Sequence, residues 1–121
     1  MAPTPFERYG GFITVRKIIS AFYDRVLDSE SLRRYFGDVE MRTLIDHQTK
    51  FVSSVMGGPA SYTDEALRRI HAPFNISQSE FNEVTEILRE TLEDFEVHPS
   101  DIKAVMGEFN RREPDIVSRH D

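Results

Sequence analysis

Two histidines on different predicted helices are the residues of this chain best suited to chemistry. His47 lies in a helical pattern over 41–56, and His71 ends a short helical run behind the glycine pair Gly57-Gly58. Their separation matches no compact metal motif such as two histidines at i and i+4. Two facing helices can nevertheless hold a flat cofactor between them, and haem iron needs a neutral imidazole on one side. Taken singly, each histidine is more often an ordinary packed or exposed residue.

Polar side chains accompany His47 on the same predicted helix. At about 100° per residue, His47, Gln48 and Phe51 all fall within about 60° of Leu44, which places the four on one face. On the preceding predicted helix, Tyr23 shares the apolar stripe and should point to the same interior. Buried tyrosine and glutamine side chains need hydrogen-bond partners. They therefore either bond to each other in an ordinary core or meet a polar ligand, such as one on a metal.

The spacing of the apolar residues predicts the elements that carry these side chains. Apolar residues recur at three and four positions, and almost nowhere at two, which is typical of amphipathic helices. A flat cofactor such as haem needs a large apolar slot. Aromatic side chains such as Phe22 and Tyr35 are available to line it. We therefore expect an all-α fold in one domain over 1–121, with helices over 12–27, 32–36, 41–56, 63–71, 78–95 and 99–113.

Local signals mark several helix ends. Ser77 with Glu80 three residues on forms a capping box, and Asp38 is the expected N-cap of the helix over 41–56. Pro114 should end or kink the last helix. We expect the tail over 114–121 to be frayed.

Composition excludes several classes of function. The chain has 121 residues with 15 Lys and Arg against 21 Asp and Glu, a net charge of −6, so nucleic-acid binding is not expected. No apolar run approaches the roughly 20 residues of a membrane span, and no signal peptide is visible. The absence of cysteine excludes thiolate chemistry and suits a reducing cytosol. We expect a cytoplasmic monomer that acts without membrane or nucleic acid.

Short motifs follow one another in a specific order, covering nearly the whole chain. They are Tyr9-Gly10-Gly11, Phe22-Tyr23-Asp24-Arg25-Val26-Leu27, Tyr35-Phe36, His47-Gln48-Thr49-Lys50-Phe51, the stretch from Gly57 to Thr63, and Leu67-Arg68-Arg69-Ile70-His71. In this order the chain resembles the truncated haemoglobins, in particular the group I (N-type) branch and its cyanobacterial members. The resemblance implies a two-on-two helical sandwich around haem.

The same resemblance implies roles for individual residues. His71 matches the proximal iron ligand, and Tyr23 matches the distal tyrosine that donates a hydrogen bond to the bound ligand. Leu44 and Gln48 match the distal-helix positions beside the ligand. His47 occupies a position that some cyanobacterial members use for a sixth iron ligand. The residues expected to contact the cofactor are Phe36, Phe51, Tyr62, Leu67, Arg68, Phe74, Ile76, Phe81 and Val84.

The resemblance also implies the cofactor and the activity. Some members bond haem covalently through a histidine of the last helix, and no histidine occurs in this chain over 110–114, so we expect non-covalent haem b. The expected activity is reversible binding of dioxygen, nitric oxide and carbon monoxide. Conversion of nitric oxide to nitrate with an unidentified reductase is a further expectation.

Two alternatives stay open at this point. With both His47 and His71 on the iron, the protein would serve electron transfer or sensing of gas or redox state. A cofactor-free helical interaction module is the other alternative, and an absorption spectrum of the purified protein separates it from any haem protein.

Overall fold

The computed structural model describes residues 4–58, 76–111 and 113–119. In these ranges helices dominate, which confirms the predicted all-α class, and none of the described helices is both long and apolar enough to cross a membrane. The helices are α1 (Pro5–Arg8), α2 (Phe12–Leu27), α3 (Glu30–Arg33), the 3₁₀ helix η1 (Arg34–Phe36), α4 (Met41–Val55), α6 (Gln78–Asp94), α7 (Pro99–Arg111) and α8 (Glu113–Ile116). Two short strands, β1 (Ile76–Ser77) and β2 (Val117–Arg119), complete the described elements.

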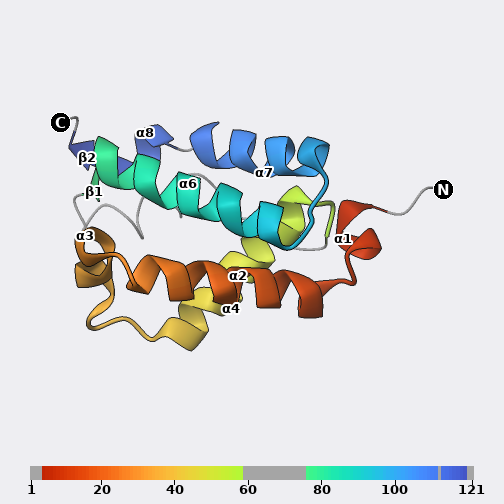
Figure 1. The fold of residues 1–121 in the computed structure, drawn as a ribbon, viewed down its shortest axis with the longest axis horizontal. Helices are drawn as coiled ribbons and strands as arrows, with labels where there is room; N and C mark the ends of the chain where they lie inside the picture. Colours follow the sequence, from red (N-terminus) through yellow and green to blue (C-terminus); the bar gives the residue numbers. More distant parts are fainter. Residues whose placement is uncertain (1–3, 59–75, 112, 120–121) are drawn as a thin grey trace.

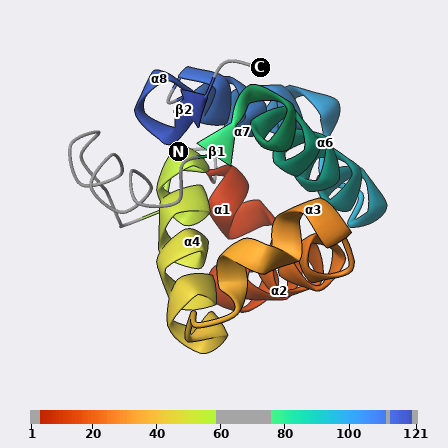
Figure 2. The same cartoon turned by 90° about the vertical axis from the view of Figure 1, so that its left-hand side faces the viewer.

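Two pairs of long helices form the body of the molecule (Figures 1 and 2). α2 packs against α4, α6 packs against α7, and the pairs meet where α2 lies against α6 and α4 against α7. This arrangement is a two-on-two helical sandwich. Its core takes fully buried side chains from all four helices, for example Ile18, Val52, Leu88 and Val105, each at most 1% exposed. Such burial contributes roughly 1.5–3 kcal/mol per large apolar side chain.

Side-chain caps set the start of two of the long helices. Ser77 and Glu80 form the predicted capping box at the start of α6, with Ser77 Oγ accepting from the Glu80 N–H at 3.1 Å. The prediction of Asp38 as N-cap of α4 is wrong, because the helix begins at Met41 and the cap is the residue before it. There Glu40 accepts a hydrogen bond from the Arg42 N–H at 3.0 Å. Glutamate is an unusual cap, so residue preference alone pointed to the wrong acidic residue.

The end of the chain is more ordered than expected. Instead of fraying from Pro114, the chain forms α8 and then β2, which pairs in parallel with β1. Val117 is buried and packs against Phe81 and Ile76. Burial of this one apolar side chain against a distant segment holds the strand in place, and a local pattern does not reveal such a contact. Residues 120–121 of the expected frayed tail lie outside the described ranges.

The first turn of the chain closes on the end of α4. The Phe6 N–H donates to the Met56 carbonyl at 3.0 Å. Gly57 ends the helix with φ at +91°, and a Cβ there would lie 2.9 Å from Thr4 Cβ. Glycine is therefore required by both its conformation and the close approach of α1. The predicted helix over 63–71 lies outside the described residues.

Candidate functional site

A cavity lies between the two helix pairs. Its volume is about 210 Å³, several times the roughly 30 Å³ that one water molecule occupies in the liquid. Because protein interiors contain few voids larger than a water molecule, a cavity of this size is a built feature of the fold. Its described lining residues are Phe22, Tyr23, Val26, Leu32, Tyr35, Phe36, Val39, Leu44, Gln48, Ile76, Phe81, Val84 and Phe109. Apart from two tyrosine hydroxyls and one amide, these side chains are apolar.

Tyr23 is the buried polar residue of this lining. Its side chain is 7% exposed, and its ring is held edge-on by Phe22 at 4.8 Å and by Phe36 at 6.0 Å between ring centroids. Burial raises the pKa of Tyr23 well above its ordinary value, so the phenol keeps its proton at any physiological pH. Its hydroxyl makes no hydrogen bond to any described residue. The group is therefore a donor that is available to a ligand in the cavity.

Leu44 and Gln48 bring the adjacent helix to the same cavity. They lie one turn apart on α4, and both line the cavity as half-buried side chains. Within the described part of the chain, the Gln48 amide also makes no hydrogen bond. The alternative of a Tyr23–Gln48 hydrogen bond in an ordinary core is therefore not what the structure shows.

The Tyr23 hydroxyl and the Gln48 amide, which have no hydrogen-bond partner among the described residues, indicate what this cavity accepts. Leaving a buried donor unpaired costs about 1–3 kcal/mol, and native proteins seldom keep such a group without a reason. A flat, largely apolar cofactor that carries a small polar ligand would satisfy both conditions. Its rings would cover the apolar walls, and the ligand would meet the Tyr23 hydroxyl and the Gln48 amide.

The expected cofactor-contact residues divide into three groups. Phe36, Ile76, Phe81 and Val84 line the cavity, and their contact with the cofactor stays a prediction. Phe51 is not among the lining residues, and its ring packs edge-on against Phe109 at 5.2 Å, behind the wall that Phe109 forms. The remaining expected contacts are outside the described residues, and they are Tyr62, Leu67, Arg68 and Phe74.

The two histidines have different outcomes. His71 lies outside the described residues, so its role as proximal ligand stays a prediction from the sequence. His47 is on α4, but its side chain is exposed and is not among the residues that line the cavity. The shared inward face predicted for His47 and Gln48 is therefore not found.

The position of His47 follows from the face of α4 that packs in the core. Val52 and Thr49 are buried, at 0% and 4% exposed, and they lie about 80° and 140° from Leu44 at 100° per residue. The buried side of α4 thus extends from Leu44 in the direction of Val52 and Thr49. His47 lies about 60° from Leu44 in the opposite direction. Leu44 and Gln48 fall on the buried side and reach the cavity, whereas His47 falls outside it.

A buried carboxylate supports one wall of the cavity. Glu80, in the first turn of α6, accepts hydrogen bonds from the Tyr35 hydroxyl at 2.6 Å and from the Ser77 N–H at 3.0 Å, and it forms an ion pair with Arg34 at 2.6 Å. Burial acts to raise the pKa of Glu80, but hydrogen bonds from Tyr35, Ser77 and Arg34 outweigh it and hold the pKa at about 2. The carboxylate is therefore ionised at physiological pH.

Sequence reasoning missed four lining residues, and helical spacing could have found three of them. Val26 follows Phe22 by four positions in α2, and Leu32 precedes Phe36 by four across the short helical turns. Phe109 follows Val105 by four in α7. Val39 lies in the segment between η1 and α4, where no periodic pattern applies.

The fold and the cavity together define the class. A two-on-two helical sandwich with an apolar slot, a buried tyrosine donor and a glutamine one helix away is a truncated globin. The sequence profile of the bacterial-like globin family matches residues 4–118. The chain belongs to this family.

Individual relatives agree with this assignment. A group 1 truncated hemoglobin of Tetrahymena thermophila is 30% identical over 95 residues, which cover 78% of each chain. Group 1 truncated hemoglobin GlbN of a Synechocystis species is 30% identical over 105 residues, 84% of each chain. Among solved structures, the group II truncated hemoglobin of Bacillus anthracis superposes with a TM-score of 0.84 at 25% identity, covering 100% of this chain and 95% of that one.

Membership establishes the cofactor. Truncated globins bind haem b, and haem iron supplies reversible coordination of diatomic gases. The haem of this chain is held without a covalent link, because the stretch over 110–114, where some members attach haem, has no histidine. The described lining fits this group, because its walls are apolar and the polar groups of Tyr23 and Gln48 make no hydrogen bond to any described residue.

Proposed function

We propose that this chain binds dioxygen, nitric oxide and carbon monoxide reversibly, and that Tyr23 is the residue that retains polar ligands. The observation that carries this proposal is the buried, protonated Tyr23 hydroxyl with no partner among the described residues, which faces the cavity. A hydrogen bond from this donor strengthens as negative charge builds up on a ligand. Gln48 supplies a second donor at the same cavity and limits the ligand to a small size together with Leu44.

We propose further that the protein converts nitric oxide to nitrate. One nitric oxide and one dioxygen combine with one electron to give nitrate, so a reductase must return that electron after each turnover. The Tyr23 donor supports this reaction because it retains bound dioxygen, the more charged of the two gases. Dioxygen therefore stays bound for longer, and nitric oxide has more time to enter and react. We place the reaction in the cytoplasm, where the reducing conditions suit a chain without cysteine.

The ligand-free iron is proposed to keep an open sixth position. His47 reaches the cavity only if α4 turns about its axis, and that rotation would expose Val52 and Thr49, which are now buried. Coordination of the iron by both His47 and His71 would therefore cost free energy of core packing, whereas an open sixth position leaves the core intact.

Absorption spectra of the purified protein test the proposed function. Ferric, ferrous and carbon-monoxide forms should differ, and photolysed carbon monoxide and dioxygen should rebind in a concentration-dependent way. The nitric oxide reaction is tested by mixing the dioxygen-bound protein with nitric oxide and measuring nitrate. A ferrous spectrum that does not change under carbon monoxide would refute gas binding, and a slow reaction without nitrate would refute the conversion.

A further inference from the structure

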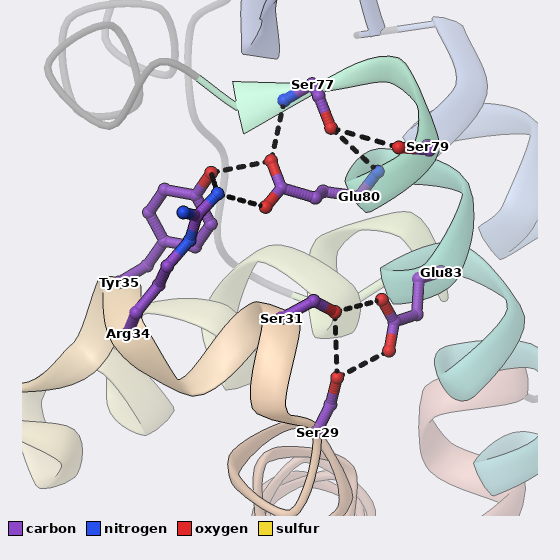
Figure 3. Close-up of polar contacts among 8 residues, drawn as sticks. All are labelled: Ser29, Ser31, Arg34, Tyr35, Ser77, Ser79, Glu80 and Glu83. Atoms are coloured by element: carbon purple, nitrogen blue, oxygen red, sulfur yellow. Dashed lines mark hydrogen bonds and ion pairs between the residues drawn. The ribbon is translucent and has the colours of Figure 1, made fainter. Parts of the chain in front are cut away.

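Three segments meet at the Glu80 carboxylate (Figure 3). One carboxylate oxygen accepts from the Tyr35 hydroxyl at 2.6 Å and from the Ser77 N–H at 3.0 Å, and the other accepts from the Arg34 guanidinium at 2.6 Å. Arg34 and Tyr35 belong to η1, whereas Ser77 ends β1 and caps α6. The side chain of Glu80 is therefore the point where η1 is fastened to the start of α6.

These contacts of Glu80 lie at the rim of the cavity described above, which is called the haem slot from here on. Tyr35 and Phe36 of η1 line the slot on one side, and Ile76, Phe81 and Val84 line it beside Glu80 on the other. Tyr35, Phe36 and Ile76 are only half-buried, so they lie at the rim and not at the floor. The hydrogen bonds from the Arg34 and Tyr35 side chains to α6 end on Glu80.

η1 depends on such a contact for its position. It is a single turn of 3₁₀ helix over three residues, and this kind of helix has poorer hydrogen-bond geometry than an α-helix. None of its three side chains is fully buried. Its backbone alone therefore gives little resistance to movement away from α6, and the hydrogen bonds to the charged Glu80 add restraint to the packing of Phe36 against the core.

We propose that Glu80 is a positioning residue that keeps the slot closed around the haem, because it anchors Tyr35 and η1 against α6 and thereby slows haem release. Haem is a rigid, flat molecule, so movement of a wall segment should ease its exit. The inference rests on the haem cofactor and not on the gas chemistry proposed above.

The same helix offers a matched control. Glu83, three residues after Glu80, accepts hydrogen bonds from the Ser29 hydroxyl at 2.5 Å and the Ser31 hydroxyl at 2.6 Å (Figure 3). It fastens α3 to α6 in the same way, but none of these three residues lines the slot. Loss of this contact should lower stability without opening the rim.

The experiment measures transfer of haem from the ferric protein to an excess of apomyoglobin. Glu80→Gln keeps a residue that can serve a capping box, but it replaces one acceptor oxygen by a donor that faces the Arg34 guanidinium. We expect haem release to become about tenfold faster, the change expected from loss of one hydrogen bond to a charged group. Tyr35→Phe should speed release severalfold, and Glu83→Gln should leave the rate unchanged while lowering the melting temperature.

A double variant separates positioning from general destabilisation. If Glu80 acts through Tyr35, the variant with both Tyr35→Phe and Glu80→Gln releases haem no faster than Glu80→Gln alone. Amide hydrogen exchange of residues 34–39 in the haem-loaded protein should be faster in both single variants and unchanged in Glu83→Gln.

Three results would overturn the inference. The first is a rate of haem release from Glu80→Gln equal to that of the wild type. The second is a double variant in which the rate increases of the two single variants multiply. The third is a rate increase in Glu83→Gln as large as that in Glu80→Gln. If Glu80→Gln does not fold, Tyr35→Phe alone decides, because it leaves the capping box intact. A wild-type protein that holds haem but binds no gas would refute the proposed function and leave these release rates fully interpretable.

Discussion

Replacement of Tyr23 by phenylalanine should change ligand retention and protein stability in opposite directions. The substitution removes only the hydroxyl, because Phe22 and Phe36 already hold the ring by edge-on contacts at 4.8 and 6.0 Å that phenylalanine keeps. No described residue bonds to that hydroxyl. A ligand in the cavity is therefore the partner that we expect for it.

The size of the effect on dioxygen follows from the strength of the lost bond. A hydrogen bond to a group with negative charge contributes about 1.5–3 kcal/mol, which corresponds to a dissociation rate about ten to a hundred times faster. Carbon monoxide carries less charge when bound, so its dissociation should change by a smaller factor. Stopped-flow replacement of dioxygen by carbon monoxide, and of carbon monoxide by nitric oxide, measures both rates.

The effect on stability has the opposite sign. In the ligand-free protein the Tyr23 hydroxyl has no partner among the described residues, and a buried donor left unpaired costs about 1–3 kcal/mol. Tyr23→Phe removes this cost, so the free energy of unfolding of the ligand-free ferrous protein should rise by about 1 kcal/mol. Denaturant unfolding under anaerobic conditions measures this change.

Tyr9→Phe is the matched control. The Tyr9 hydroxyl donates to Asp101 at 2.6 Å and accepts from the His98 N–H at 2.9 Å, away from the cavity lining. Its loss should lower the free energy of unfolding and leave both gas dissociation rates unchanged. Equal rate changes for the two gases in Tyr23→Phe, or a clear loss of stability there, would refute the reasoning.

Three further predictions concern the iron ligands and the supporting carboxylate. His71→Ala should lose haem on purification and regain a haem spectrum with added imidazole, and normal haem retention would contradict the assignment of His71 as the proximal ligand. The ligand-free ferrous protein should be high-spin, and His47→Leu should leave its spectrum unchanged, because His47 lies outside the cavity lining; a low-spin native form that becomes high-spin in this variant would restore the six-coordinate alternative. Hydrogen bonds to Glu80 outweigh its burial and hold its pKa at about 2, below the ordinary 4.5, so its contribution to stability is complete above pH 4.5 and is lost as the pH falls through 2. Acid unfolding followed by circular dichroism should therefore depend less on pH between 4.5 and 2 in Glu80→Gln than in the wild type.

Much of the fold is determined by short-range features of the sequence. The apolar spacing over 12–27 predicts α2 with the ends that the structure has, and the Ser77–Glu80 capping box predicts the start of α6. Both signals act within one or two helical turns, because hydrogen bonds and side-chain neighbours in a helix are three and four residues apart. Tyr23 could be assigned to the interior for the same reason, since it shares the stripe of Phe22 and Val26.

Only the tertiary structure decided how the helices face one another. The angles around the axis of α4 place His47 and Gln48 on one broad face with Leu44. Packing of α4 against α2 buries the part of this face that contains Gln48 and leaves His47 exposed. The pairing of β1 with β2 and the bond between Tyr35 and Glu80, 45 residues apart, likewise join segments that are distant in the chain. Periodicity gives the direction of a side chain relative to its own helix axis, whereas a site depends on the neighbouring helix, whose position is set by burial of the whole core.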